Sequence, residues 1–191
     1  ATAGQRARGG PPADQRVDRV VVSAEAIAER MPALAAEIAA GLGPTPRDPV
    51  LVAVMTGALI FAADLVRQLP VPLRLGLATV SSYPGTATMS QGARLQGDLP
   101  SDLAGRDVIL VDDILDSGRT LRLLQSRIMA LNPASLRTCV LLRKTIPSAL
   151  ETPCDHIGFD IPDVFVVGYG LDYDGYYRNL PAVFAMVPVT S

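Results

Sequence analysis

Aromatic residues, histidine and cysteine are scarce in this 191-residue sequence. There is no Trp, and only 5% of residues are aromatic although 49% are hydrophobic. The core must therefore consist mainly of Val, Leu, Ile and Ala, as is typical of a parallel sheet covered by helices. The two cysteines, Cys139 and Cys154, are too few for a disulfide framework, and we expect free thiols. The one histidine, His156, has no partner nearby in the sequence, so we assign it no role and expect a loop or surface position.

Long apolar runs and strong charge are also missing. No run approaches the roughly 20 residues of a membrane-spanning helix, and the N-terminus has no apolar signal segment. The net charge is −2, and the Lys and Arg residues are scattered rather than grouped into a basic stripe. We therefore expect a cytoplasmic protein with neither a membrane nor a nucleic-acid partner.

The apolar pattern predicts strands that alternate with helices. Predicted strands cover 17–22, 50–55, 71–83, 107–112 and 135–144, and predicted helices cover 24–43, 58–69 and 117–132. Ser23 is the predicted N-cap of the first helix, and Pro32 predicts a kink or a split within it. This alternation indicates an α/β fold with a parallel sheet and right-handed connections.

The length of the chain and its composition indicate a single domain that is preceded by an N-terminal arm. Residues 1–16 are rich in Gly, Ala, Pro and charge, which predicts a disordered arm, and 17–191 form the single domain. Its core spans about 23–144, and a small hood is made by 145–191 together with the strand near 17–22. The polar, Gly-rich segment 84–104 is either a functional lid or a disordered loop.

The stretch VILVDDILDSGRTL, residues 108–121, places three carboxylates and two hydroxyls at the end of a predicted strand. In an open parallel sheet, ligands bind beyond the carboxyl ends of the strands. The following helix N-terminus favours an anion, and Gly118 allows close approach of the backbone. Neither GxxxxGK[ST] nor GxGxxG is present, so this is not a Walker loop or a dinucleotide fingerprint.

The adjacent pair Asp112 and Asp113 would repel a phosphate but suits sugar hydroxyls or Mg²⁺. The stretch therefore predicts a ribose 5-phosphate site. Asp116 would lie near the anomeric carbon, where it could transfer a proton.

Together with SSY at 81–83, LLRK at 141–144, FVVGYGLDY at 165–173 and YRNLP at 177–181, this stretch resembles the motifs of type I phosphoribosyltransferases, most closely the hypoxanthine-guanine phosphoribosyltransferases. The resemblance covers about 17–188. It implies the type I phosphoribosyltransferase fold, with a central parallel sheet flanked by helices and a small C-terminal hood. It also implies transfer of the phosphoribosyl group of 5-phosphoribosyl-1-pyrophosphate (PRPP) to hypoxanthine and/or guanine, giving the nucleoside monophosphate and pyrophosphate. Mg²⁺ is the implied cofactor, and a homodimer or homotetramer the implied assembly.

The resemblance also implies roles for individual residues. The PRPP site comprises Asp112, Asp113, Asp116, Ser117, Gly118, Arg119, Thr120, Thr56, Gly57 and Arg178. The base site comprises Lys144, Phe165, Val166 and Asp172; Asp172, Asp112 and Asp113 are the implied metal residues, and Ser82 and Tyr83 belong to the lid. Asp116 matches the general acid or base that faces N7 of the purine.

Two positions depart from the family pattern. Thr56-Gly57 stands where the family usually has Lys-Gly, so the cation beside pyrophosphate is missing. Arg119 replaces a frequent lysine, which is a milder change because the charge is retained.

Other functions remain open from the sequence alone. The Lys144 ammonium only donates hydrogen bonds, which favours a 6-oxo group over the amino group of adenine but does not exclude xanthine. A PRPP-binding transcriptional regulator would share the fold, but we expect it to lack an aspartate at position 116 and to have a basic face. A phosphate-binding module without catalysis would not need Asp116, Lys144 and Asp172 together.

Overall fold

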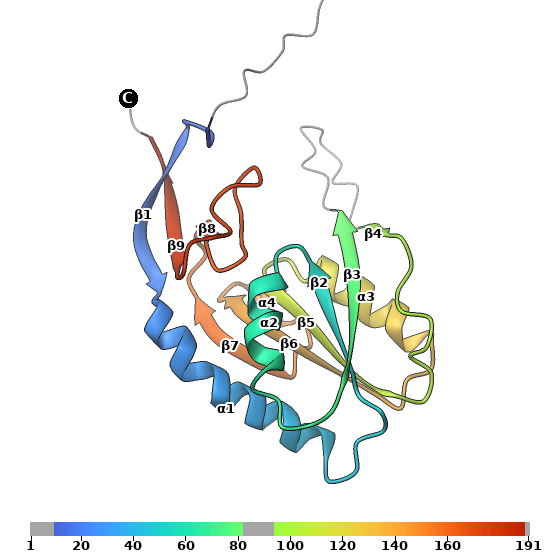
Figure 1. The fold of residues 1–191 in the computed structure, drawn as a ribbon. Helices are drawn as coiled ribbons and strands as arrows, with labels where there is room; N and C mark the ends of the chain where they lie inside the picture. The colour runs from blue at the N-terminus through green and yellow to red at the C-terminus, as the bar shows by residue number, and fades with distance from the viewer. Residues whose placement is uncertain (1–9, 82–93, 190–191) are drawn as a thin grey trace, which may run out of the picture.

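The computed structural model describes residues 10–81 and 94–189, which form a six-stranded sheet, a three-stranded sheet and four helices (Figure 1). The strands are β1 (Gln15–Val22), β2 (Val50–Met55), β3 (Arg74–Ser81), β4 (Arg94–Gln96), β5 (Asp107–Leu115), β6 (Ser135–Lys144), β7 (His156–Ile161), β8 (Val166–Val167) and β9 (Val183–Pro188). The helices are α1 (Ala24–Leu42), α2 (Leu59–Val66), α3 (Arg119–Met129) and α4 (Pro147–Leu150). None of these helices is long and apolar enough to cross a membrane.

The larger sheet has the order β4-β3-β2-β5-β6-β7, and only β4 is antiparallel to its neighbour. The expected α/β fold with a mostly parallel sheet is thereby confirmed. From β2 the chain first adds β3 on one side and then returns to place β5 on the other side. The order therefore reverses between β2 and β5, and this is the point where an open parallel sheet forms its ligand crevice.

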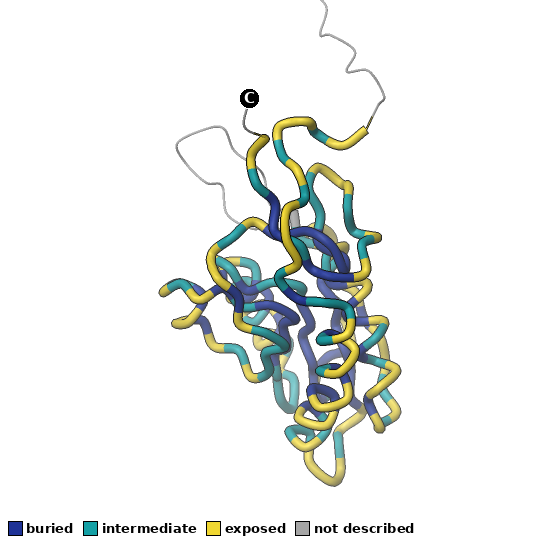
Figure 2. Tube along the Cα trace, turned by 90° about the vertical axis from the view of Figure 1, so that its left-hand side faces the viewer, coloured by how far each residue is buried: buried dark blue, intermediate teal, exposed yellow. Residues whose placement is uncertain are grey.

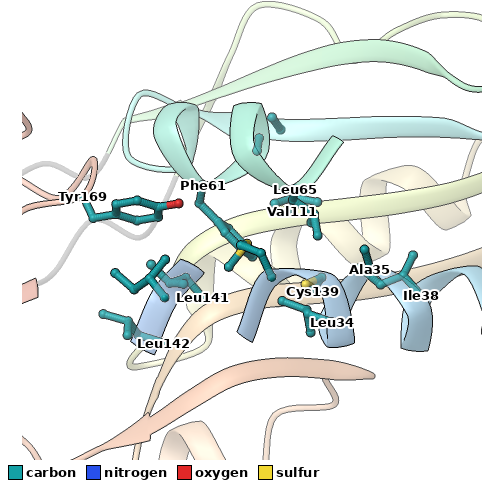
Figure 3. Close-up of a cluster of buried hydrophobic side chains, with 14 of the residues drawn as sticks. Leu34, Ala35, Ile38, Phe61, Leu65, Val111, Cys139, Leu141, Leu142 and Tyr169 are labelled. Carbon is teal, nitrogen blue, oxygen red and sulfur yellow. The ribbon is translucent and has the colours of Figure 1, made fainter. Parts of the chain in front are cut away.

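Helices cover both faces of the larger sheet. One core cluster joins α1 and α2 to inward residues such as Leu51, Ile109 and Leu141, and Figure 3 shows Phe61 and Leu65 extending from α2 into it. The second cluster joins α3 and α4 to the alternate residues, such as Val52 and Leu110. Figure 2 shows the buried positions concentrated inside the molecule, with exposed residues along the outer turns and loops. Because both faces are covered, the central strands are continuous apolar runs.

The first helix is not split at Pro32. The hydroxyl of Ser23 accepts a hydrogen bond from the Ala26 N–H at 3.1 Å, as expected of the N-cap, and α1 continues through Pro32 to Leu42. Its buried residues Ile27 and Met31 precede the proline, and Leu34 and Ile38 follow it. Burial on both sides offsets the cost of an internal proline, which is about 3 kcal/mol.

The strand β5 is longer than predicted, because it continues past the expected end at residue 112 to Leu115 and so contains both residues of the acidic pair. β6 provides a hydrogen-bonding partner as far as Leu115, which pairs with Arg143. On the other side, pairing with β2 stops at Val111. The last residues of β5 therefore have a strand on one side only, which opens the other side to the crevice.

The hood is built by the three-stranded sheet β1-β9-β8, which brings the two ends of the described chain together (Figure 1). The expected limit of the core at residue 144 was wrong, because β7 pairs with β6 and completes the larger sheet. The expected end of the N-terminal arm at residue 16 was also too late, since Gln15 and Arg16 pair with β9; residues 1–9 lie outside the described residues.

Two other expectations need correction. Within the segment expected as a loop at 84–104, residues 94–96 form β4 beside β3, while 82–93 lie outside the described residues. His156 is not in a loop but begins β7, and its Nε2 atom is buried with no hydrogen-bond partner in the described part of the chain. Cys139 and Cys154 are free thiols, as expected.

Candidate active site

A hollow of about 410 Å³ opens at the point where the strand order reverses. Its walls come from the end of β2, the end of β5, the N-terminus of α3 and the hood. Every residue predicted for the PRPP site lines it: Thr56, Gly57, Asp112, Asp113, Asp116, Ser117, Gly118, Arg119, Thr120 and Arg178. We call this hollow the phosphate hollow.

The acidic pair differs in exposure. Asp112 is buried, and Asp113 is partly exposed. Burial and the neighbouring Asp113 charge raise the pKa of Asp112 well above its usual value. Burial also raises the pKa of Asp113, although a side-chain hydrogen bond with Asp112 and hydrogen bonds from the backbone N–H groups of Ile114 and Asp113 oppose the shift. Two carboxylates held this closely favour a shared proton, a cation or hydroxyl donors nearby.

Glycines allow three segments to meet beside Asp113. A Cβ on Gly57 would lie 1.7 Å from Asp113 Oδ2, so no larger residue fits there without displacing the carboxylate. A Cβ on Gly170 of the hood would lie 2.2 Å from the Gly57 carbonyl oxygen. The β2–α2 loop, in which the Met55–Thr56 peptide bond is cis, is therefore enclosed between β5 and the hood. Thr56 lines the phosphate hollow without a cationic side chain.

The turn before α3 is supported from behind by residues that the sequence did not single out. Gly118 has φ +72°, and a Cβ there would lie 2.1 Å from Thr152 Oγ1. Arg122 donates to Thr152 Oγ1 at 2.6 Å and to the Ser117 carbonyl at 2.8 Å, and the Ser148 hydroxyl donates to the Asp116 carbonyl at 3.3 Å. These contacts hold the N-terminus of α3, whose N-cap residue Gly118 has no side chain, beside the hollow, where it favours an anion.

A second hollow of about 190 Å³ adjoins the first and shares Asp113, Asp116 and Asp172 with it. Lys144, Phe165 and Val166 complete its wall, so all the residues predicted for the base site lie together. Phe165 is 46% exposed, and its ring meets Tyr173 edge to face with ring centroids 5.6 Å apart. An exposed ring face beside an apolar wall suits a planar aromatic ligand. We call this hollow the base hollow.

Lys144 ends β6 with its ammonium between two carboxylates. Its Nζ atom is 3.1 Å from Asp116 Oδ2 and 3.0 Å from Asp163 Oδ1. Burial alone would lower the pKa of Lys144, but the hydrogen bonds to Asp163 and Asp116 outweigh it and raise the pKa. The lysine is therefore a cation at neutral pH.

Asp172 and Arg178 form an ion pair at the rim shared by the two hollows. Arg178 Nη2 lies 2.7 Å from Asp172 Oδ1, and its Nη1 donates to the Gly170 carbonyl at 2.5 Å. The other Asp172 oxygen accepts from the Gly175 N–H at 2.7 Å. The pair thus holds an anionic and a cationic group next to the phosphate hollow.

The described residues contain no group of three or more His, Cys, Asp or Glu side chains that could enclose a metal ion alone. Mg²⁺ is usually bound by one or two carboxylates together with substrate phosphates and waters. Asp113 and Asp172 both line the phosphate hollow and supply such carboxylates, and Asp112 lies beside them. The donor set therefore fits an ion that arrives with a phosphorylated substrate.

The hood contacts α2 through Tyr169, a residue to which the sequence analysis gave no role. The Tyr169 hydroxyl donates to Asp64 Oδ2 at 2.5 Å, across 105 residues of sequence, and Figure 3 shows the ring pointing toward α2. Burial and this bond raise the pKa of Tyr169 far above its usual value. Two predicted lid residues, Ser82 and Tyr83, lie outside the described residues.

Comparison with known proteins agrees with this arrangement. The family described as "Phosphoribosyl transferase domain" matches residues 22–174. The hypoxanthine-guanine phosphoribosyltransferase of Mycobacterium tuberculosis is 41% identical over 177 residues, covering 90% of this chain and 87% of that protein, and that of Bacillus subtilis is 36% identical over 173 residues, covering 90% and 94%. The crystal structure of a hypoxanthine-guanine phosphoribosyltransferase from Bacillus anthracis superposes with a TM-score of 0.81 at 32% identity, covering 91% of this chain and 99% of that one. The chain belongs to the phosphoribosyltransferase family, and these relatives within it are hypoxanthine-guanine phosphoribosyltransferases.

Proposed function

We propose that this protein is a purine salvage enzyme that transfers the 5-phosphoribosyl group from PRPP to hypoxanthine or guanine, releasing pyrophosphate. The observation that carries the proposal is the pair of adjoining hollows, one lined by a helix N-terminus and carboxylates, the other by Lys144 and Phe165. The two hollows share Asp113 and Asp116, so a ribose bound at these residues would lie next to a base in the second hollow. The names of the relatives support the same reaction.

The proposed binding mode places each part of PRPP in the phosphate hollow. The 5-phosphate binds at residues 116–120, where backbone N–H groups and hydroxyls donate to it. The ribose hydroxyls donate to Asp112 and Asp113, which accept when ionised. The pyrophosphate lies toward Thr56, Gly57 and Arg178.

The purine binds in the base hollow, stacked on the exposed Phe165 ring with its edge toward the Val166 backbone. The Lys144 ammonium donates to O6, which selects a 6-oxopurine because adenine would present a second donor. This position brings N7 toward Asp116 and N9 toward the sugar.

In the reaction the bond from C1 of the ribose to the pyrophosphate oxygen breaks, and N9 of the base forms the new bond from the opposite face, inverting C1. Asp116 accepts the purine proton from N7 as that bond forms. Arg178 stabilises the charge that develops on pyrophosphate. Asp172, with Asp112 and Asp113 beside it, would hold a Mg²⁺ ion, which would supply further neutralisation of the charge on the leaving group.

We further propose that the protein assembles as a homodimer or homotetramer in the cytoplasm. Leu75 and Leu77 of β3 are 65% and 60% exposed, and Leu59 of α2 is also exposed, so apolar surface is left uncovered in one chain. Light scattering after size-exclusion chromatography tests the assembly, and a monomer at micromolar concentration would contradict it.

A panel of bases tests the function. Purified protein with Mg²⁺ and PRPP is given hypoxanthine, guanine, xanthine, adenine or uracil separately, and nucleotide formation is followed by absorbance. Turnover of hypoxanthine or guanine is the expected result. Turnover of xanthine alone would retain the fold and mechanism but replace the substrate. PRPP binding without turnover of any base would overturn the proposal and favour a PRPP-binding regulator.

A further inference from the structure

We propose that Asp163, to which neither the motifs nor the family resemblance gave a role, positions the Lys144 ammonium for recognition of the base. Asp163 lies in the turn between β7 and β8, two residues before Phe165. The proposal rests on the proposed function, because it concerns how the base hollow of that enzyme is held ready.

The geometry distinguishes Asp163 from an ordinary surface carboxylate. The Lys144 side chain is only 11% exposed, and its Nζ lies 3.0 Å from Asp163 Oδ1, slightly closer than to Asp116 Oδ2. The two carboxylates come from separate connections, Asp116 from the β5–α3 connection and Asp163 from the turn between β7 and β8. An ammonium has three N–H donors, so with two directed at these carboxylates the third remains for the base.

The charges around the ammonium explain why a second carboxylate is needed. Asp116 contacts Lys144, and Asp113 and Asp172 line the same hollow. If Asp163 were absent, Asp116 would be the only carboxylate within ion-pair distance of Lys144 in the described structure. The ammonium would then be drawn to Asp116 alone, away from O6, and Asp116 would be less available to N7. Asp163 attracts the ammonium from a second direction, and this keeps the Lys144 ammonium and the Asp116 carboxylate in place.

The amino-acid composition allows the protonation of Lys144 to be measured directly. Lys144 is the only lysine in the chain, whereas the other cationic side chains are arginines. Protein labelled with ¹³C at lysine Cε therefore gives a single lysine signal, whose chemical shift follows the protonation of this one group. Its titration can be read without any turnover.

The experiment compares Asp163→Asn with a matched control, Asp160→Asn. Asp160 is also an aspartate paired with a β6 cation, Arg143 at 2.6 Å, but neither residue is among those that line the two hollows of the described structure. We expect Lys144 to titrate at lower pH in Asp163→Asn than in the wild type, and at the wild-type pH in Asp160→Asn. We also expect KM for hypoxanthine to rise about three- to tenfold in Asp163→Asn, a modest loss because Asp163 is solvent-exposed, with kcat and the KM for PRPP little changed.

An unchanged Lys144 titration in Asp163→Asn, or an equal change in Asp160→Asn, would overturn the positioning role. A loss of thermal stability with no change in titration or in KM for the base would mean that Asp163 only attaches the hood, which also overturns it. If the wild type turns over no base, the proposed enzyme fails, but the lysine signal still shows whether Asp163 holds the ammonium. The two failures are therefore distinguishable.

Discussion

The two hollows are adjacent but built in different ways. Most of the wall of the phosphate hollow is one continuous run, residues 112–121, with a short segment from the end of β2, Val80 of β3 and two residues from the hood. The base hollow takes its wall from β5, the end of β6 and the hood segments around 165–166 and 171–172. The first is a local structure of strand, turn and helix, whereas the second exists only when the hood is seated on the core.

This difference indicates how each site responds to change. The phosphate hollow depends on backbone conformation, because helix N–H groups and a glycine turn form much of it. The base hollow depends on side chains that cross from hood to core, such as Lys144 with Asp163 and Tyr169 with Asp64. Changes in the first should therefore affect PRPP, and changes in the second should affect the base.

The largest effect is expected where the two hollows meet. Asp116→Asn keeps the size of the side chain and an acceptor for Lys144 but removes the carboxylate that we propose takes the N7 proton. We expect kcat to fall about 100-fold or more, in the range typical of general acid–base catalysis, with both KM values much less affected. Steady-state kinetics with both substrates measure this, and a kcat within about threefold of the wild type would exclude Asp116 as the base.

A change confined to the phosphate hollow should separate the two substrates. In Gly118→Ala, a Cβ would be forced into left-handed backbone at φ +72° and to within 2.1 Å of Thr152 Oγ1. The left-handed strain alone costs about 1–2 kcal/mol, so we expect KM for PRPP to rise about tenfold or more with KM for hypoxanthine unchanged.

Gly105→Ala is the matched control for this prediction. Gly105 has a similar φ of +70°, but a Cβ there would meet nothing within 4 Å. It should lose a similar amount of stability in thermal unfolding while retaining both KM values. An equal rise in the KM for PRPP in both variants would contradict a specific role for the turn at Gly118.

A change in the attachment of the hood should affect the base hollow first. Tyr169→Phe removes the hydroxyl that donates to Asp64 and leaves the ring in the core. We expect the free energy of unfolding to fall by about 1–2 kcal/mol and KM for hypoxanthine to rise about two- to fivefold, with a smaller effect on PRPP. Tyr173→Phe, which removes an exposed bond to Asp14, should change stability less. A larger effect on PRPP than on the base would contradict the comparison of the two hollows.

The smallest effect on activity is expected at His156, which pairs with Cys139 well before the end of β6 that supplies Lys144. Burial lowers the pKa of His156 below its usual value of 6.5. The unfolded chain therefore binds a proton more readily than the folded one, so the folded state loses stability as pH falls below about 6.5.

His156→Val places a β-branched residue in the strand and removes the titratable imidazole. Between pH 7.5 and pH 5 the wild type should lose more free energy of unfolding than the variant in denaturant unfolding, while both KM values stay the same. An equal pH dependence in the two proteins would show that His156 has the same pKa in the folded and the unfolded chain.

The sequence alone determined the sheet and the phosphate end of the site. Apolar runs such as 50–55 and 135–144 identified β2 and β6, and the string 112–120 identified a turn that now lines one hollow. These features were predictable because strand periodicity, helix capping and glycine turns are encoded within a few residues. The motifs near Lys144 and Phe165 were recognisable for the same reason, whereas their placement in one site was implied only by the family resemblance.

Only the tertiary structure decided the rest. The acidic pair lies inside β5 because β6 continues beside it, Gly57 is required because Asp113 reaches it, and His156 is half-buried because β7 joins the larger sheet. Lys144 meets Asp163 across 19 residues, and Tyr169 meets Asp64 across 105. Such contacts depend on how separate elements pack. No periodicity or motif spacing in the sequence connects the residues that packing brings together. Local sequence therefore determined most of the lining of the phosphate hollow, and the packing of the hood on the core decided which residues line the base hollow.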